Sequence, residues 1–157
     1  MAITVGLQAP DFTLYDNNKN KVTLSEQKGK NVVLIFFPLA FTGTCTKELC
    51  SIRDTYNIYE QLDAQVYGIS VDSLHVLDKF KKEQDLNFPL LSDFNKKASR
   101  AYGSIYEYFF NDMEGVSKRS AFVIDKEGIV CYAEVLENAL ELPDFTAIQN
   151  CLKEINA

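Results

Sequence analysis

The feature that most constrains the fold is an unbroken apolar stretch, Val-Val-Leu-Ile-Phe-Phe, at residues 32–37. Its β-branched and aromatic residues favour a β-strand. Because the stretch contains no polar residue, both faces of that strand are expected to be covered, as in the central strand of an α/β protein. The stretch is far too short to cross a bilayer.

Strand-like and helix-like patterns follow one another along the chain, and no Pro/Gly/Ser-rich linker divides them. This order predicts an α/β sandwich around a mixed sheet, formed by a single domain over residues 1–157. The expected elements are a hairpin-like entry over 3–24, the central strand, a helix over about 44–62, a strand over 65–71, a helix over 73–86 capped by Ser73, a short strand over 88–93, a short helix over 95–103 closed by Gly103, two strands joined by a turn over 118–135, and an amphipathic helix over 143–155.

The composition excludes several classes of partner. Sixteen basic and twenty-two acidic residues give a net charge of -6, which argues against nucleic acid, and no basic run suggests an anionic membrane surface. The start, Met1–Val5, lacks the charged and apolar regions of a signal peptide. We therefore expect a cytoplasmic protein, in which the four cysteines are reduced and either catalytic or buried.

Cys45 lies at a position where a reactive thiol is expected. The apolar stretch ends at Pro38, and a short Thr/Gly segment leads to Cys45 near the start of the predicted helix. Unpaired backbone N–H groups and the positive end of the helix dipole stabilise a thiolate there. The carboxyl end of a central strand is also where open α/β sheets place their sites.

The charge that activates Cys45 is not expected to come from histidine. The chain has one histidine, His75, which lies between apolar neighbours on a predicted surface helix. A solvent-facing or half-buried role is the better interpretation, so a Cys–His hydrolase is poorly supported. Arginine, which stays charged at any working pH, is the alternative, and the chain offers Arg53, Arg100 and Arg119.

The pattern Pro38-x-x-x-Thr42-x-x-Cys45 resembles the active-site signature of the peroxiredoxins, thiol peroxidases built on a thioredoxin fold. The likeness extends over residues 3 to about 135. The sequence around the site is most similar to that of the E-type alkyl hydroperoxide reductases, whereas the Cys45–Cys50 spacing resembles that of the Q-type, or bacterioferritin-comigratory, group. The resemblance implies a thioredoxin fold with the family's N-terminal extension and a central mixed sheet flanked by helices. The other similar segments are VGLQAPDFTL, FPLLSD and KRSAFVID.

The resemblance also implies a role for each matching residue. Cys45 would attack the peroxide O–O bond, Thr42 would hydrogen-bond the sulfur and the peroxide, and Pro38 would shield the sulfur from water. Arg119 would hold the thiolate and the developing charge, and Glu48 would orient an arginine. Fixed donors of this kind lower the barrier of such a displacement, so no metal or organic cofactor is expected.

Each of these residues has a plainer interpretation when taken alone. The stretch Thr42–Thr44 could cap a helix, Arg119 could be a surface charge, and Glu48 could be an acid that the helix dipole favours. Pro38 could simply end a strand. Their coincidence in one ordered pattern favours the catalytic interpretation.

Cys50 departs from the E-type pattern, which has no thiol at that place. Oxidised Cys45 is a sulfenic acid, which could condense with Cys50 to a disulfide. On an intact helix the two Cα atoms would lie roughly 8 to 9 Å apart, beyond the disulfide limit of about 7 Å. The resolving role therefore requires Thr44 to about Arg53 to unwind, with Gly43 as a hinge. A redox-inert packing role for Cys50 stays open.

The remaining cysteines, Cys131 and Cys151, are expected to be packing residues. Neither stands in a Val-Cys-Pro tail of the typical two-cysteine peroxiredoxins, so an intermolecular disulfide is not expected.

The resemblance implies hydrogen peroxide or small organic hydroperoxides as substrates, and thioredoxin, a glutaredoxin-like protein or a small thiol as reductant. A homodimer is also implied, and the aromatic segment 106–110 could be a contact surface or core packing. The alternative functions are a thioredoxin-like disulfide reductase, which would require a Cys-x-x-Cys motif, and a redox-inert binding module. Scattered cysteines argue against a zinc site.

Overall fold

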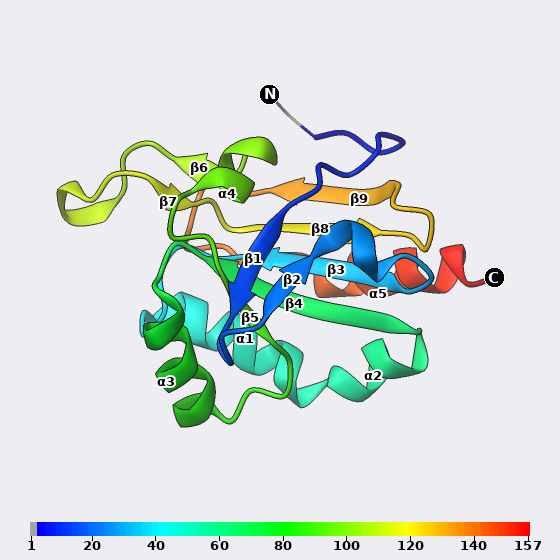
Figure 1. Cartoon of the computed structure of the whole chain (residues 1–157), viewed down its shortest axis with the longest axis horizontal. Helices are drawn as coiled ribbons and strands as arrows, with labels where there is room; N and C mark the ends of the chain where they lie inside the picture. The colour runs from blue at the N-terminus through cyan, green and yellow to red at the C-terminus, as the bar shows by residue number, and fades with distance from the viewer. Residues whose placement is uncertain (1–2) are drawn as a thin grey trace.

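The computed structural model describes residues 3–157, so the first two residues of the Met1–Val5 segment lie outside the described part. Seven strands form a sheet in the order β2-β1-β5-β4-β3-β8-β9, and β6 and β7 form a separate two-stranded ribbon (Figure 1). The strands are β1 (Thr13–Asp16), β2 (Lys21–Thr23), β3 (Asn31–Phe36), β4 (Ala64–Ser70), β5 (Leu90–Ser92), β6 (Ile105–Tyr106), β7 (Val116–Ser117), β8 (Ser120–Ile124) and β9 (Val130–Val135). The helices are α1 (Gly43–Asp54), α2 (Tyr56–Gln61), α3 (Leu74–Gln84), α4 (Lys97–Ala101) and α5 (Phe145–Ile155), with 3₁₀ turns η1 (Leu24–Gln27) and η2 (Phe110–Asp112).

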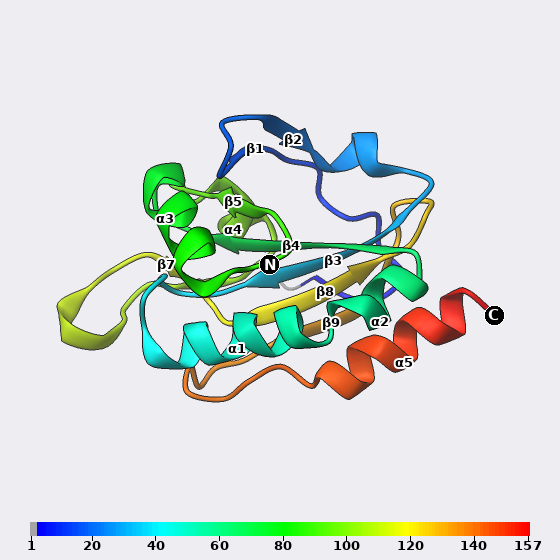
Figure 2. The same cartoon turned by 90° about the horizontal axis from the view of Figure 1, so that it is seen from below.

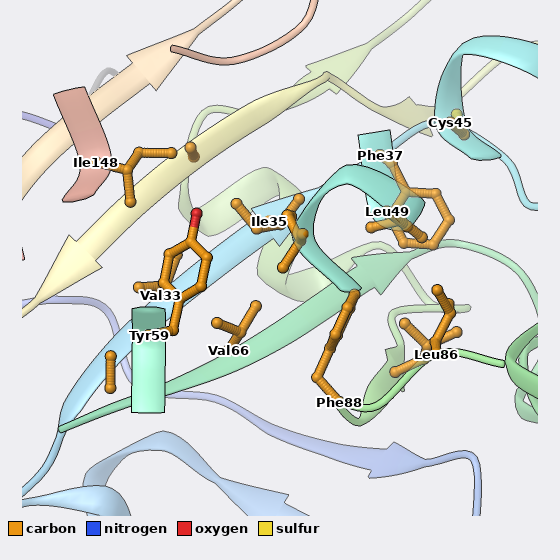
Figure 3. Close-up of a cluster of buried hydrophobic side chains, with 14 of the residues drawn as sticks. Val33, Ile35, Phe37, Cys45, Leu49, Tyr59, Val66, Leu86, Phe88 and Ile148 are labelled. Atoms are coloured by element: carbon orange, nitrogen blue, oxygen red, sulfur yellow. The ribbon is translucent and has the colours of Figure 1, made fainter. Parts of the chain in front are cut away.

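Strand β3 occupies the centre of the sheet, as its apolar run predicts. It pairs in parallel with β4 and antiparallel with β8, and every one of its residues is buried. Val33 and Ile35 contribute to the core beneath α1, α2, α3 and α5 (Figure 3), whereas Val32, Leu34 and Phe36 contribute to the core on the other face. Figure 2 shows α1, α2 and α5 along the same face of the sheet. The predicted mixed sheet flanked by helices is confirmed.

The helix predicted over about 44–62 is wrong in one respect, because two helices occupy that range. They are separated at Thr55, whose backbone (φ −118°, ψ 19°) leaves the helical region. The Thr55 hydroxyl donates to the carbonyl of Ser51 at 3.0 Å, a local bond by which threonine competes with the regular helix. The helix that carries Cys45 and Cys50 is therefore a short unit with a break at its far end.

The segment 105–117, which we call the aromatic arm, was not predicted as strands. It projects from the edge of the molecule in Figure 1 as β6, η2 and β7. Two-residue strands are too short to show an alternating pattern. Tyr106 is buried and stacks on Phe109, with ring centroids 5.7 Å apart, but Tyr108 and Phe110 are exposed. The aromatic segment thus divides between packing and open surface.

Membrane association, localisation and the number of domains are the remaining sequence predictions. Among the helices described over 3–157, none is long and apolar enough to cross a membrane. That residues 1–157 form one domain, and that the protein is cytoplasmic, stay predictions.

Candidate active site

Cys45 lies in the first turn of α1, directly after the loop that leaves β3. Pro38 is buried in that loop, and Thr42 is the N-cap residue of α1. The Thr42 side chain makes no capping hydrogen bond, and the first N–H groups of a helix have no intrahelical partner. Cys45 is only 1% exposed and belongs to the core cluster that includes Phe37 and Leu49 (Figure 3). The thiol is therefore shielded, close to several backbone donors.

Arg119 is the cation that reaches this thiol. It stands just before β8, is 2% exposed, and places Nη2 at 3.2 Å from Cys45 Sγ. Its Nη1 donates to Glu48 Oε1 at 2.7 Å, and its Nε donates to the carbonyl oxygen of Ala139 at 2.8 Å. Because three separate N–H groups are engaged, the guanidinium is fixed in orientation as well as in position.

Glu48 and Arg119 form a buried ion pair. Burial raises the pKa of Glu48 to about 7, although the charge and the hydrogen bond of Arg119 oppose the shift, and Glu134 adds to it. Burial also acts against the charge of Arg119, but Glu48 and Cys45 outweigh it and raise the arginine's pKa. Arg119 therefore stays charged between the Glu48 carboxyl group and the Cys45 sulfur.

The Thr42 hydroxyl has a partner other than sulfur in this structure. Thr42 is exposed, and its Oγ1 donates to the carbonyl of Leu39 at 2.8 Å. Its own carbonyl accepts from both the N–H and the hydroxyl of Thr46. The residue thus ties the loop to the first turn of α1, and its family-implied bond to sulfur and peroxide stays a prediction.

Cys50 lies on α1 together with Cys45, so the intact helix separates their Cα atoms by roughly 8 to 9 Å. The Cys50 thiol is half-buried at the edge of the core, with its Sγ 3.6 Å from Gln84 Oε1. A disulfide cannot form in this arrangement.

The other arginines and the histidine lie elsewhere. Arg53 donates to Asp54 and to the carbonyl of Gln84, and Arg100 pairs with Glu107 at the surface. His75 is exposed, as predicted, in the first turn of α3. It lines a cavity of about 550 Å³ between β1, the start of α3 and residues 92–98.

Cys131 and Cys151 are both half-buried. Cys131 is the extra residue of a bulge, because Val123 pairs with Tyr132 and the next residue of β8 pairs with Val130. Burial and then Asp125 raise the pKa of Cys131 to about 11, and burial raises that of Cys151. Neither is a ready nucleophile, which fits the predicted packing role. Over the described residues, no three His, Cys, Asp or Glu side chains are grouped to hold a metal.

Two groups in this region escaped the sequence interpretation. The Ala139 carbonyl that accepts from Arg119 is a backbone atom, so no residue type signals it. Asp72, which accepts the N–H of Ala40 at 2.8 Å, follows the carboxyl end of β4. The rule that places sites at this edge of an α/β sheet could have singled it out.

Comparison with known proteins identifies the family of this site. Residues 5–133 match the family described as AhpC/TSA. The chain is 43% identical over 136 residues to alkyl hydroperoxide reductase E of Mycobacterium tuberculosis, covering 85% of this chain and 86% of the relative. The chain is a peroxiredoxin of the E/Q type. This peroxiredoxin is also 39% identical over 130 residues to Peroxiredoxin Bcp of Bacillus subtilis, covering 82% of each chain.

Solved structures place the fold of this peroxiredoxin. Peroxidoxin BcpB from Mycobacterium tuberculosis superimposes with a TM-score of 0.87 at 28% identity, over 99% of each chain. The predicted thioredoxin fold is confirmed. As a member of this family the protein is a thiol-dependent peroxidase, an oxidoreductase that takes a peroxide substrate and a thiol reductant.

Proposed function

We propose that Cys45 is the thiol of this peroxiredoxin that reduces hydrogen peroxide and small organic hydroperoxides. The observation that carries the proposal is the fixed, buried contact of 3.2 Å between Arg119 Nη2 and Cys45 Sγ. In the reaction the sulfur bonds to one peroxide oxygen while the O–O bond breaks. Cys45 becomes a sulfenic acid, and the other oxygen leaves as an alkoxide or hydroxide that takes up a proton.

The surrounding groups have distinct parts in this proposal. Arg119 stabilises the thiolate and the charge that spreads over the reacting atoms. Glu48 holds the guanidinium through its bond of 2.7 Å. Pro38, buried beside the site, limits the access of water. Thr42 would turn its hydroxyl from Leu39 toward the peroxide when the substrate enters.

We propose further that Cys50 resolves the sulfenic acid. Its thiol would attack Cys45 Sγ, so that the disulfide forms and water leaves. The break at Thr55 supports this step, because α1 can unwind between Gly43 and Asp54 without carrying α2 with it. The burial of Leu49 and Ile52 opposes it, so the unwound state is expected only after oxidation. Thioredoxin, a glutaredoxin-like protein or a small thiol would then return the two thiols.

Intact mass and a cysteine peptide map test this cycle. Reduced protein receives one equivalent of hydrogen peroxide without reductant. Loss of two hydrogens, mapped to a Cys45–Cys50 link, is the expected result, and Cys50→Ser should instead gain oxygen on Cys45. Cys151→Ser is the matched control and should behave as the parent does. Oxygen gained on Cys45 in the parent, with Cys50 still free, would make this a one-cysteine enzyme that awaits an external thiol.

A homodimer is the last part of the proposal. In the aromatic arm Tyr108 is 82% exposed and Phe110 is 55% exposed, and Leu140 is 65% exposed. Exposed apolar groups of this size favour a contact with another protein chain. Sedimentation velocity should report a dimer, and Phe110→Asp should weaken it. A monomeric parent protein would refute the proposed homodimer and leave the proposed peroxidase cycle unaffected. We propose in addition that the protein is cytoplasmic, where its thiols would be kept reduced.

A further inference from the structure

The loop between β3 and α1 contains a strained residue next to the helix start. Phe41 has a left-handed backbone with φ of 67°, a region that bulky side chains rarely occupy and that the surroundings must hold in place. Its ring packs edge-on against Phe80 of α3, with centroids 5.0 Å apart. Phe80 itself is fully buried. One anchor of the loop therefore comes from α3.

A second anchor comes from Asp72, at the end of β4. Its Oδ2 accepts the backbone N–H of Ala40 at 2.8 Å, and the same oxygen accepts the hydroxyl of Ser70 at 2.6 Å. The hydroxyl of Ser92 on β5 donates to the backbone carbonyl of Asp72 at 2.6 Å. Asp72 is thus held by two strands, because Ser70 of β4 fixes its carboxylate and Ser92 of β5 fixes its backbone.

The two anchors act on consecutive residues, Ala40 and Phe41, and Thr42 with the first turn of α1 follows at once. If the N–H of Ala40 were released, Phe41 could relax to an ordinary φ. The first turn, with Cys45, would then rotate away from Arg119. The geometry at a reacting atom matters at the level of an ångström, so an anchor outside the site can control the reaction.

We propose that Asp72 is a positioning residue for Cys45. By accepting the N–H of Ala40, its carboxylate keeps Phe41 left-handed and fixes the first turn of α1 against the guanidinium of Arg119. Asp72 touches none of the reacting atoms. The inference rests on the proposed function, in which Cys45 is the attacking thiol.

Two substitutions at Asp72 separate the acceptor from the charge. Asp72→Asn keeps an oxygen that can accept from both Ala40 and Ser70, whereas Asp72→Ala does not. The rate constant for oxidation of Cys45 by hydrogen peroxide is expected to fall between about 10- and 100-fold in Asp72→Ala. It should stay within about threefold of the parent in Asp72→Asn. Asp78→Ala, which removes an α3 carboxylate paired with Lys82, is the matched control and should match the parent.

A second measurement distinguishes a positioning role from a general loss of stability. Alkylation of Cys45 by iodoacetamide is compared with alkylation of Cys151 in the same sample, by peptide mass. In Asp72→Ala the Cys45/Cys151 ratio should change while the urea midpoint shows the protein still folded. Phe41→Gly, which adopts a positive φ without strain, supplies a second test. Adding Asp72→Ala to Phe41→Gly should lower the rate less than it lowers the rate of the parent.

The inference is overturned if Asp72→Ala oxidises Cys45 at the parental rate, or if Asp72→Asn loses as much as Asp72→Ala. Equal effects of Asp72→Ala with and without Phe41→Gly would overturn it as well. Failure of the proposed function has a different signature, because Cys45→Ser would then still consume peroxide. If Cys45→Ser is inactive and Asp72→Ala is unaffected, only the positioning role fails.

Discussion

Glu48 is expected to make the protein less stable as the pH rises from about 5.5 to about 8. Its side chain is completely buried, and burial raises its pKa from 4.5 to about 7 despite the attraction of Arg119. Between these two values the folded protein binds a proton that the unfolded chain does not. The stabilising contribution is therefore complete below the unfolded pKa and is lost as the pH rises through the folded pKa.

The size of this effect follows from the two pKa values. For a single group with these values, the stability lost between about pH 5.5 and about pH 8 is about 2 kcal/mol. Glu48→Gln removes the titration but leaves an amide oxygen that can accept from Arg119. Both proteins are compared in a Cys45→Ser background, so that they differ only at Glu48. The difference in unfolding free energy between Cys45→Ser and Cys45→Ser/Glu48→Gln should then change by about 2 kcal/mol over this range.

Urea unfolding followed by far-UV circular dichroism at several pH values in this range measures that difference. Glu60→Gln, in the same background, removes an exposed glutamate of α2 and should leave the pH dependence as in the background protein. A difference that stays constant with pH would show that Glu48 is ionised throughout. Arg119 would then outweigh burial, and the reasoning about this pair would be refuted.

Three further substitutions test the fixed donors, the packing and the N-terminal segment. Arg119→Lys keeps the charge, but a lysine cannot donate to the sulfur, the carboxylate and the carbonyl at the same time. The rate constant for oxidation by peroxide, measured in a stopped-flow competition assay, should therefore fall about 100- to 1000-fold. A loss below about threefold would show that the guanidinium geometry is not required. Gly68→Ala places a Cβ 2.7 Å from a side-chain carbon of β5 and should cost about 1 to 3 kcal/mol in urea unfolding. Its control, Gly43→Ala, meets nothing within 4 Å and should not destabilise, and equal stabilities of the two would show that the core accommodates the methyl group. Tyr102→Phe removes a hydroxyl that donates to the carbonyl of Pro10 at 2.7 Å; it should cost about 1 kcal/mol and speed amide exchange over residues 8–12, and unchanged exchange there would show that this bond does not hold the segment.

Some of this protein was determined by the sequence alone, because the signals are local. The apolar run of β3 has no face that tolerates water, so its place at the centre of a sheet follows from composition. Ser73 accepts from the N–H of Val76, as a capping serine does. Cys45 in the first turn of a helix after the central strand follows from strand, loop and helix patterns in succession.

Tertiary structure decided which groups surround that thiol. Arg119 lies 74 residues from Cys45 along the chain, and without the family resemblance nothing local distinguishes it from Arg53 or Arg100. The break at Thr55 and the strain at Phe41 are also beyond a periodic pattern. They depend on individual bonds and contacts, such as that of Phe41 with Phe80. Patterns of hydrophobicity fix which faces are buried, whereas the orientation of a buried charge depends on partners that only the folded chain brings together.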